Sequence, residues 1–171
     1  MTSKEYELIK EMLQMQAKLD EAIMKEYGLD EIDEEKLSFA ILDEVGELTH
    51  ELKGNWCWWK KTQAPVDDNK VLGELVDIWH FVLSWQNHFN HGEKGIEDTC
   101  MVERNSKARL SYLRNNRVSL TETFCDLVSW EWNKLEGLIA ISEYLGFTIE
   151  QVYEAYCGKN KINYQRLESG Y

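Results

Sequence analysis

The chain contains a single proline in 171 residues, and this scarcity constrains its fold more than any other feature. Proline interrupts helix interiors, and Pro65 lies between two long segments of apolar periodicity rather than inside one. Strict alternation of apolar and polar residues, which is typical of strands, does not persist anywhere. The sequence therefore predicts an all-α fold, and we expect a compact bundle of five or six helices.

Apolar residues at spacings of three and four outline four of these helices, over about 4–27, 33–54, 70–88 and 95–113. Gly28 is placed to end the first helix. Two capping boxes, which begin at Ser119 and Thr148, predict two further helix starts. Segment 55–69 has no apolar period and is predicted to be a loop. A chain of this length suits one domain, so we expect residues 1–171 to form a single unit.

Composition excludes several partners. The 31 acidic and 19 basic side chains give a formal net charge of −12, which argues against binding to nucleic-acid polymers or anionic membranes. No apolar run reaches the roughly 18 residues that span a bilayer, and a cytoplasmic protein is expected. Four scattered cysteines without a C-x-x-C pair predict reduced thiols in the core.

Two acids on the predicted helix 70–88 are unusual for their surroundings. Apolar residues surround this helix axis almost completely, which is the profile of a buried helix. Glu74 and Asp77 interrupt that profile on one face. Because removing an unpaired charge from water typically costs several kcal/mol, the pair needs a counter-charge, a proton or a solvent cleft.

A second acid pair lies on the preceding helix. Glu44 and Glu47, with Glu51 one turn later, border its apolar stripe. If the two helices pack side by side, their carboxylates converge, and a hard divalent cation such as Mg²⁺ relieves the repulsion. Two alternatives stay open: the acids pair with lysines or face solvent, or Glu47-x-x-His50 and Asp77-x-x-His80 hold a di-iron centre. We expect the histidines to be packing residues with satisfied hydrogen bonds.

Two basic segments stand out from the acidic background, Trp58-Trp59-Lys60-Lys61 and the C-terminal stretch 159–166. Carboxylates that hold a metal, when faced by Lys and Arg, suit a nucleotide polyphosphate. The loop tryptophans can stack on a base, or they can cap the core or seal a subunit interface.

The order of these motifs resembles the dimeric all-α dUTPase family. The resemblance rests on Glu44-x-x-Glu47, Glu74-x-x-Asp77 and a Lys159, Asn163, Arg166, Tyr171 tail, together with Gln16-x3-Asp20. The two acid pairs alone are shared with MazG-type pyrophosphohydrolases. Members of this family are homodimers, so the resemblance implies a homodimer with tryptophan-rich helical surfaces at its interface.

The resemblance also implies an activity, the Mg²⁺-dependent hydrolysis of dUTP and dUDP to dUMP by a metal-activated water. The implied metal-binding and catalytic residues are Glu44, Glu47, Glu74 and Asp77, with Glu47 orienting the water or accepting its proton. The implied substrate-binding residues are Gln16, Asp20, Trp59, Lys60, Phe81, Lys159, Asn163, Arg166 and Tyr171. Among these, the resemblance implies that Lys159 and Arg166 hold phosphates and that Gln16 and Asn163 read uracil. Because Phe81 projects between Glu74 and Asp77 on the helix, we further expect its ring to pack against deoxyribose.

Two other functions remain open at this point. The same acid pairs serve pyrophosphohydrolases of other deoxynucleotides, such as dCTP. An acidic helical bundle can also be a non-enzymatic interaction protein.

Overall fold

A computed structural model of the chain describes residues 1–129 and 133–170, and everything regular in these ranges is helical. The elements are α1 (Ser3–Tyr27), α2 (Glu34–Glu51), α3 (Lys53–Trp56), α4 (Asp68–Phe89), the 3-10 turn η1 (Gly92–Ile96), α5 (Thr99–Arg114), α6 (Leu120–Val128), α7 (Lys134–Tyr144) and α8 (Ile149–Glu168). The all-α prediction is confirmed. The expected number of five or six helices is wrong, because eight α-helices lie in the described ranges.

The predicted helix starts and stops are governed by the expected caps. The side chains of Ser119 and Thr148 each accept a hydrogen bond from the backbone N–H three residues later. The backbone N–H groups of Ser119 and Thr148 in turn donate to the Glu122 and Gln151 side chains, which completes both capping boxes. Gly28 ends α1 in the left-handed conformation at φ 63°. The two helices that the sequence did not predict, α3 and α7, lie where the apolar periodicity is weak. The four-residue α3 falls partly in the predicted loop, and α7 follows a break after Ser129, whose backbone is extended.

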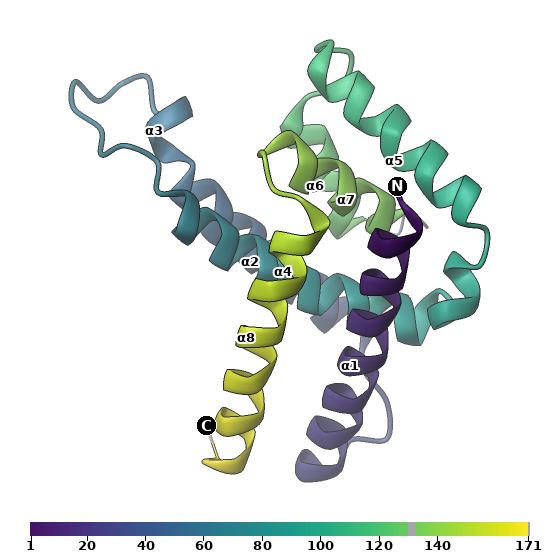
Figure 1. Ribbon diagram of the computed structural model, residues 1–171. Helices are drawn as coiled ribbons and strands as arrows, with labels where there is room; N and C mark the ends of the chain where they lie inside the picture. Colours follow the sequence, from purple (N-terminus) through teal and green to yellow (C-terminus); the bar gives the residue numbers. More distant parts are fainter. Residues whose placement is uncertain (130–132, 171) are drawn as a thin grey trace.

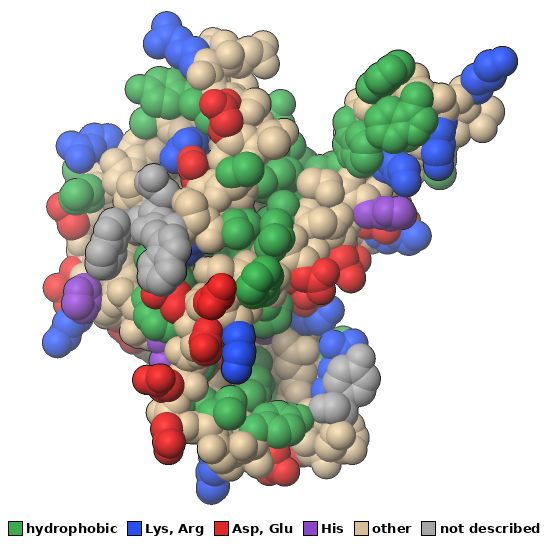
Figure 2. Space-filling view, turned by 180° about the vertical axis from the view of Figure 1, so that it is seen from behind, with side chains coloured by type: hydrophobic (Ala, Val, Ile, Leu, Met, Phe, Trp, Pro, Cys, Tyr) green, Lys and Arg blue, Asp and Glu red, His purple; other side chains and the backbone are tan. Residues whose placement is uncertain are grey.

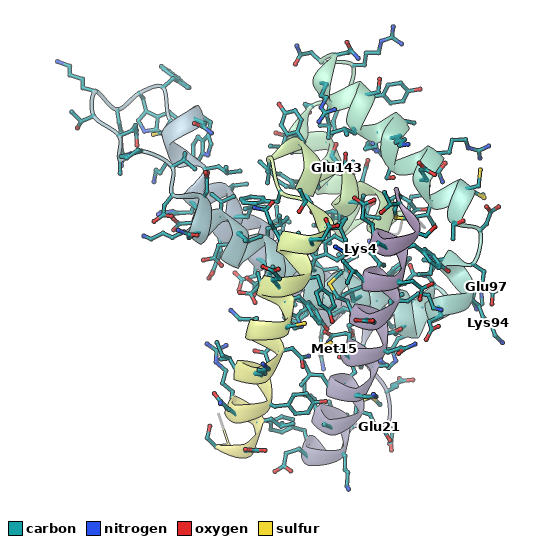
Figure 3. All side chains as sticks on the ribbon, viewed as in Figure 1. Lys4, Met15, Glu21, Lys94, Glu97 and Glu143 are labelled. Carbon is teal, nitrogen blue, oxygen red and sulfur yellow. The ribbon has the colours of Figure 1, made fainter. Side chains whose placement is uncertain are left out.

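The core forms around α4, as the apolar profile of that helix predicts. Half of its 22 residues are buried, and the indole N–H of Trp79, which is fully buried, donates to Ser142 Oγ on α7 at 3.1 Å. Helix α2 packs along α4 (Figure 1). Helices α1 and α8 lie side by side, run in the same direction and cross this pair, with side chains such as Met15 filling the space between them (Figures 1 and 3). Two segments far apart in the sequence therefore meet beside α2 and α4.

The segment that joins α2 to α4 projects from the body as an arm, which we define as residues 53–67 (Figure 1). Its tip carries hydrophobic side chains next to lysines (Figure 2). Trp58 and Trp59 are 87% and 57% exposed, so these indoles do not cap the core of their own chain.

The cysteine prediction is only partly confirmed. All four thiols are free, but only Cys57 is buried, whereas Cys100 and Cys125 are exposed. Both exposed residues lie on the outer face of amphipathic helices, where scattered spacing alone gives no signal. None of the helices in the described ranges is both long enough and apolar enough to cross a membrane.

Candidate active site

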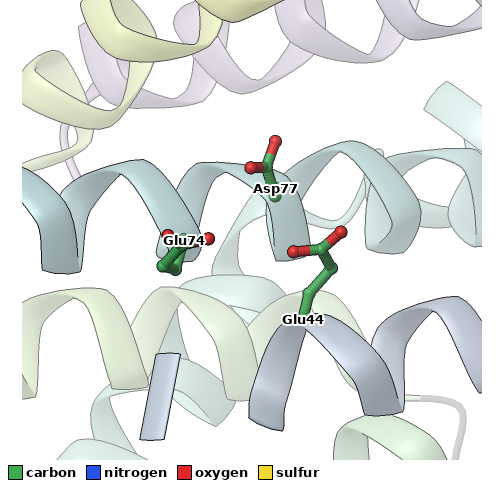
Figure 4. A group of neighbouring side chains, drawn as sticks. All are labelled: Glu44, Glu74 and Asp77. Carbon is green, nitrogen blue, oxygen red and sulfur yellow. The ribbon is translucent and has the colours of Figure 1, made fainter. Parts of the chain in front are cut away.

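Three carboxylates from two helices converge between α2 and α4. Glu44 comes from α2, and Glu74 and Asp77 come from successive turns of one face of α4 (Figure 4). One oxygen from each lies within 4.8 Å of the others. No histidine joins this group among the residues that the structure describes, so the group has the all-oxygen donor set of a hard divalent cation rather than that of a Glu-x-x-His iron centre.

Burial and the mutual repulsion of the carboxylates raise the pKa values of this cluster. Burial, and then the charges of Asp77, Glu47 and Glu74, raise the pKa of Glu44 to about 7. Burial and the nearby Glu47 also raise the pKa of Glu74. Like charges brought together out of water disfavour ionisation, and a cation would reverse that effect. The cluster therefore has the electrostatics of a cation site.

Two basic residues of α8 face the same acids. Lys159 Nζ lies 2.5 Å from Asp77 Oδ2, and Arg166 is close enough for its charge to oppose the burial that raises the Asp77 pKa. Pairing with lysines is one alternative to a metal site, and for Asp77 the structure does contain such a pair. Neither Glu44 nor Glu74 forms an ion pair of its own with another described residue.

A cavity of about 530 Å³ opens beside this cluster, between α1, α2, α4 and α8. It brings together eight of the residues singled out by sequence: Gln16, Asp20, Glu44, Asp77, Phe81, Lys159, Asn163 and Arg166. One end of the cavity is thus charged. The remaining wall is largely apolar, since Leu19, Ile23, Leu37 and Ala40 also line it. A mostly apolar pocket with a few convergent polar groups is typical of a small-molecule site.

Polar groups at the inner wall of the cavity form a connected network. Gln16 Nε2 donates to Asp20 Oδ1 at 2.7 Å, and Gln16 Oε1 accepts from Tyr156 at 2.8 Å and lies 2.8 Å from His80 Nδ1. The His80 ring stacks on Tyr156 with centroids 4.1 Å apart. His80 Nε2, in contrast, has no hydrogen-bond partner. The histidine packs as predicted, but its second nitrogen is not satisfied.

Other predicted residues do not line this cavity. Glu47 and Glu74 line a separate hollow of about 360 Å³, which also contains His50. Trp59 and Lys60 lie on the exposed arm and do not line the cavity of their own chain. Tyr171 lies outside the described residues.

Sequence reasoning did not anticipate several residues that line the cavity. Leu19, Ile23 and Leu37 line the cavity, but they occur in regular apolar periods, which indicate only a helix face that packs on the core. Tyr156, which anchors the network, carries no motif of its own. For the basic end, only the spacing of Lys159, Asn163 and Arg166 gave a signal, because these three positions share one face of a helix.

A comparison with known families bears directly on this geometry. The family described as dUTPase matches residues 8–171, which is nearly the whole chain. The search of curated proteins found no match. The matched range includes the acid cluster, the cavity and the described part of the C-terminal tail. The chain therefore belongs to the all-α dUTPase family, whose members are dUTP diphosphatases.

Proposed function

We propose that the protein hydrolyses dUTP, and also dUDP, to dUMP in a Mg²⁺-dependent reaction. The observation that carries this proposal is the meeting of Glu44 and Asp77 with Lys159 and Arg166 at one end of a cavity large enough for a nucleoside. Glu74 adds a third carboxylate oxygen within 4.8 Å of the other two. Carboxylates that can bind a metal lie next to basic side chains that can bind phosphate. The apolar wall in the rest of the cavity suits a base and a sugar.

The residues present fit a divalent cation. Three carboxylates offer oxygens within 4.8 Å of one another, and burial together with their mutual repulsion raises the pKa values of Glu44 and Glu74. We assign Glu44, Glu74 and Asp77 as the ligands, with Glu47 beside Glu74 as the fourth acid. When bound, Mg²⁺ at this site would lower the pKa of water and offset the charge on phosphate oxygens.

Three side chains of the protein have the other roles in the proposed reaction. Glu47 is exposed at the edge of the cluster, where its carboxylate can orient the attacking water and take its proton. Lys159 Nζ and the Arg166 guanidinium hold phosphate oxygens and place the scissile bond near the acids. Since dUTP and dUDP both give dUMP, the bond that breaks joins the α and β phosphates in either substrate.

The nucleoside lies further along the cavity. Phe81 follows Asp77 by one helical turn and lines the same wall, where its ring can pack against deoxyribose. A ribose 2′-OH placed on an apolar ring would lose its hydrogen bonds to water. Asn163, which also lines the cavity, offers an amide with both a donor and an acceptor for the uracil edge.

We further propose that residues 1–171 form one domain and that two chains form a dimer. The arm supports this second proposal, because Trp56, Trp58 and Trp59 expose large apolar surfaces that a partner chain would cover. In such a dimer Trp59 and Lys60 would contribute to binding from the arm. Helix α8, by contrast, faces the acids of its own chain.

A nucleotide panel tests this function. Purified protein is incubated with dUTP, dUDP, dCTP, dTTP and UTP, with Mg²⁺ or with a chelator, and nucleoside monophosphates are separated by chromatography. The proposal expects dUMP from dUTP and dUDP with Mg²⁺, and none with the chelator. Preferential release of dCMP would instead assign the protein to a dCTP pyrophosphohydrolase activity, and release of no nucleotide would favour an interaction protein.

A further inference from the structure

The basic side chains are unevenly distributed along the chain. Residues 99–118, which comprise α5 and the turn after it, contain five basic residues and one acidic residue, whereas the rest of the chain contains 14 basic and 30 acidic residues. One of the five, Arg109, is held by an ion pair with Asp126 on α6, from Nη1 to Oδ2 at 2.6 Å. Helix α5 packs on α7 at the edge of the bundle (Figure 1), and none of its residues lines the large cavity. This local positive charge therefore lies outside the site proposed for the nucleotide.

The outer face of α5 carries this positive charge into solvent. Arg104, Lys107 and Arg114 share that face at spacings of three and seven residues. All three are exposed, and exposed Arg117 follows just beyond the end of the helix. We call these four residues the basic ridge. The opposite face of α5 is held against the protein by four buried residues: Val102, Ser106, Leu110 and Leu113. The packing of α5 thus keeps the basic ridge turned outward.

The arginines of the basic ridge have no counter-charge within the protein. Arg104, Arg114 and Arg117 form no ion pair with any residue in the ranges that the structure describes. Lys107, in contrast, pairs with Glu103 one turn away on the same helix. A guanidinium group matches a carboxylate with two parallel hydrogen bonds. The ridge therefore presents three guanidinium groups that can bind carboxylates from outside.

Apolar side chains border the basic ridge on one side. Met101, Ala108 and Tyr112 follow one another along α5 at spacings of seven and four residues, which places them on a strip next to the arginines. Met101 is 47% exposed and Tyr112 is 45% exposed. Arg, Tyr and Met are enriched at protein–protein interfaces, whereas Lys and Glu are depleted there. This combination favours a surface that binds protein over a merely solvated helix face.

We propose that the outer face of α5 is a docking surface for an acidic segment of a partner protein, in which apolar side chains lie beside the carboxylates. The arginines of the ridge pair with those carboxylates, and Met101 and Tyr112 pack against the apolar side chains. A polynucleotide fits less well, because the net charge of −12 repels a long polyanion, whereas a short acidic segment covers only the ridge. A segment docked on α5 does not compete with a nucleotide, since α5 contributes no residue to the cavity.

Fluorescence anisotropy tests the proposal with a defined probe. The probe is a labelled helical peptide of about 14 residues, in which Glu recurs at the spacings of the ridge and Leu lies beside it. We expect the native protein to bind this peptide at about 50 mM salt and to bind it at least about threefold more weakly at about 300 mM. A peptide of the same composition with shuffled positions should bind at least about fivefold more weakly, because its carboxylates no longer face the arginines.

Substitution of the ridge provides the second arm of the test. Arg104→Gln combined with Arg114→Gln should weaken peptide binding about tenfold or more, because it removes two guanidinium groups. The matched control, Lys18→Gln with Lys25→Gln, removes two charges from exposed sites on α1 and should change the affinity less than about twofold. Turnover of dUTP should be the same in both double variants as in the native protein.

The remaining outcomes overturn the proposal. Absence of binding up to about 0.5 mM protein, equal binding of the shuffled peptide, or equal weakening by the two double variants contradicts a docking surface on α5. Tighter binding of a labelled oligothymidylate would make the occupant a polynucleotide. A change of oligomeric state in the arginine double variant, measured by sedimentation, would make it a second copy of the chain. Failure of the native protein to hydrolyse dUTP would refute the proposed function and leave this inference standing.

Discussion

Replacing Glu44 with Gln should stabilise the metal-free protein at pH 8 and remove its stabilisation by Mg²⁺. The pKa of Glu44 is raised from 4.5 to about 7, first by burial and then by Asp77, Glu47 and Glu74. Glu44 is therefore ionised at pH 8, where it adds one more negative charge to the cluster. The neutral amide has nearly the same shape and removes that charge.

The sign of the pH dependence follows from linkage. A carboxyl group whose pKa is higher in the folded than in the unfolded chain favours folding at low pH, and this advantage is lost as the pH rises from 4.5 through about 7. The benefit of Glu44→Gln is thus full at pH 8 and shrinks toward pH 5, where the native carboxyl group is already protonated in the fold.

The magnitude follows from the spacing of the oxygens, which lie within 4.8 Å of one another. Two unit charges at that distance repel by about 0.9 kcal/mol in a water-like dielectric and by about 3.5 kcal/mol at an effective dielectric of about 20. Because Glu44 is only half-buried, solvent screening favours the lower part of this range, or about 1–2 kcal/mol. For a chain of this size, that corresponds to a rise in Tm of about 3–6 °C.

Differential scanning calorimetry measures this effect at pH 5 and pH 8, with a chelator or with Mg²⁺. The matched control is Glu154→Gln, which removes the same charge from an exposed site on α8 and should leave Tm and the Mg²⁺ response unchanged. The reasoning is refuted if Glu44→Gln lowers Tm at pH 8 in chelator, or if Mg²⁺ raises its Tm as much as that of the native protein.

Three further substitutions test other parts of the account. Arg166→Ala should lower kcat/KM for dUTP at least about tenfold, since it removes a charged phosphate partner; steady-state kinetics that match the native protein would exclude Arg166 from the site. Ser142→Ala leaves the buried Trp79 indole N–H without its acceptor and should lower the free energy of unfolding by about 1–2 kcal/mol in urea titrations; an unchanged midpoint would mean that the bond at 3.1 Å contributes nothing. Thr148→Ala breaks the capping box of α8 and should cost about 1 kcal/mol by the same titration, with a loss below a few tenths contradicting the capping argument.

Much of the fold could be predicted because the decisive signals are local. Apolar residues on all sides of α4 indicate that this helix is buried. The capping boxes at Ser119 and Thr148 predict the exact residues at which α6 and α8 begin. The break between α6 and α7 was missed because no proline or glycine marks it. Residues within α7 are buried on nearly every side, which gives the sequence no amphipathic period to follow.

The candidate site was predictable where one helix face carries several functional groups, as with Glu74 and Asp77, or Lys159 and Asn163. Contacts between distant helices left no such signal. Lys159 and Asp77 are 82 positions apart, and only the crossing of α8 over α4 brings their charges together. His80 Nδ1 likewise lies 2.8 Å from Gln16 Oε1, 64 positions away, so sequence spacing indicated only a packing residue.

The central claim is that carboxylates of α4 hold the metal for dUTP hydrolysis, and turnover by Glu74→Gln and Asp77→Asn tests it most directly. Release of dUMP from dUTP in Mg²⁺ is compared among the native protein, both variants and Glu154→Gln, with circular dichroism confirming that each is folded. We predict that both site variants lose about a hundredfold or more in kcat/KM and that Glu154→Gln keeps native activity. Near-native dUMP release by folded Glu74→Gln and Asp77→Asn would contradict the claim.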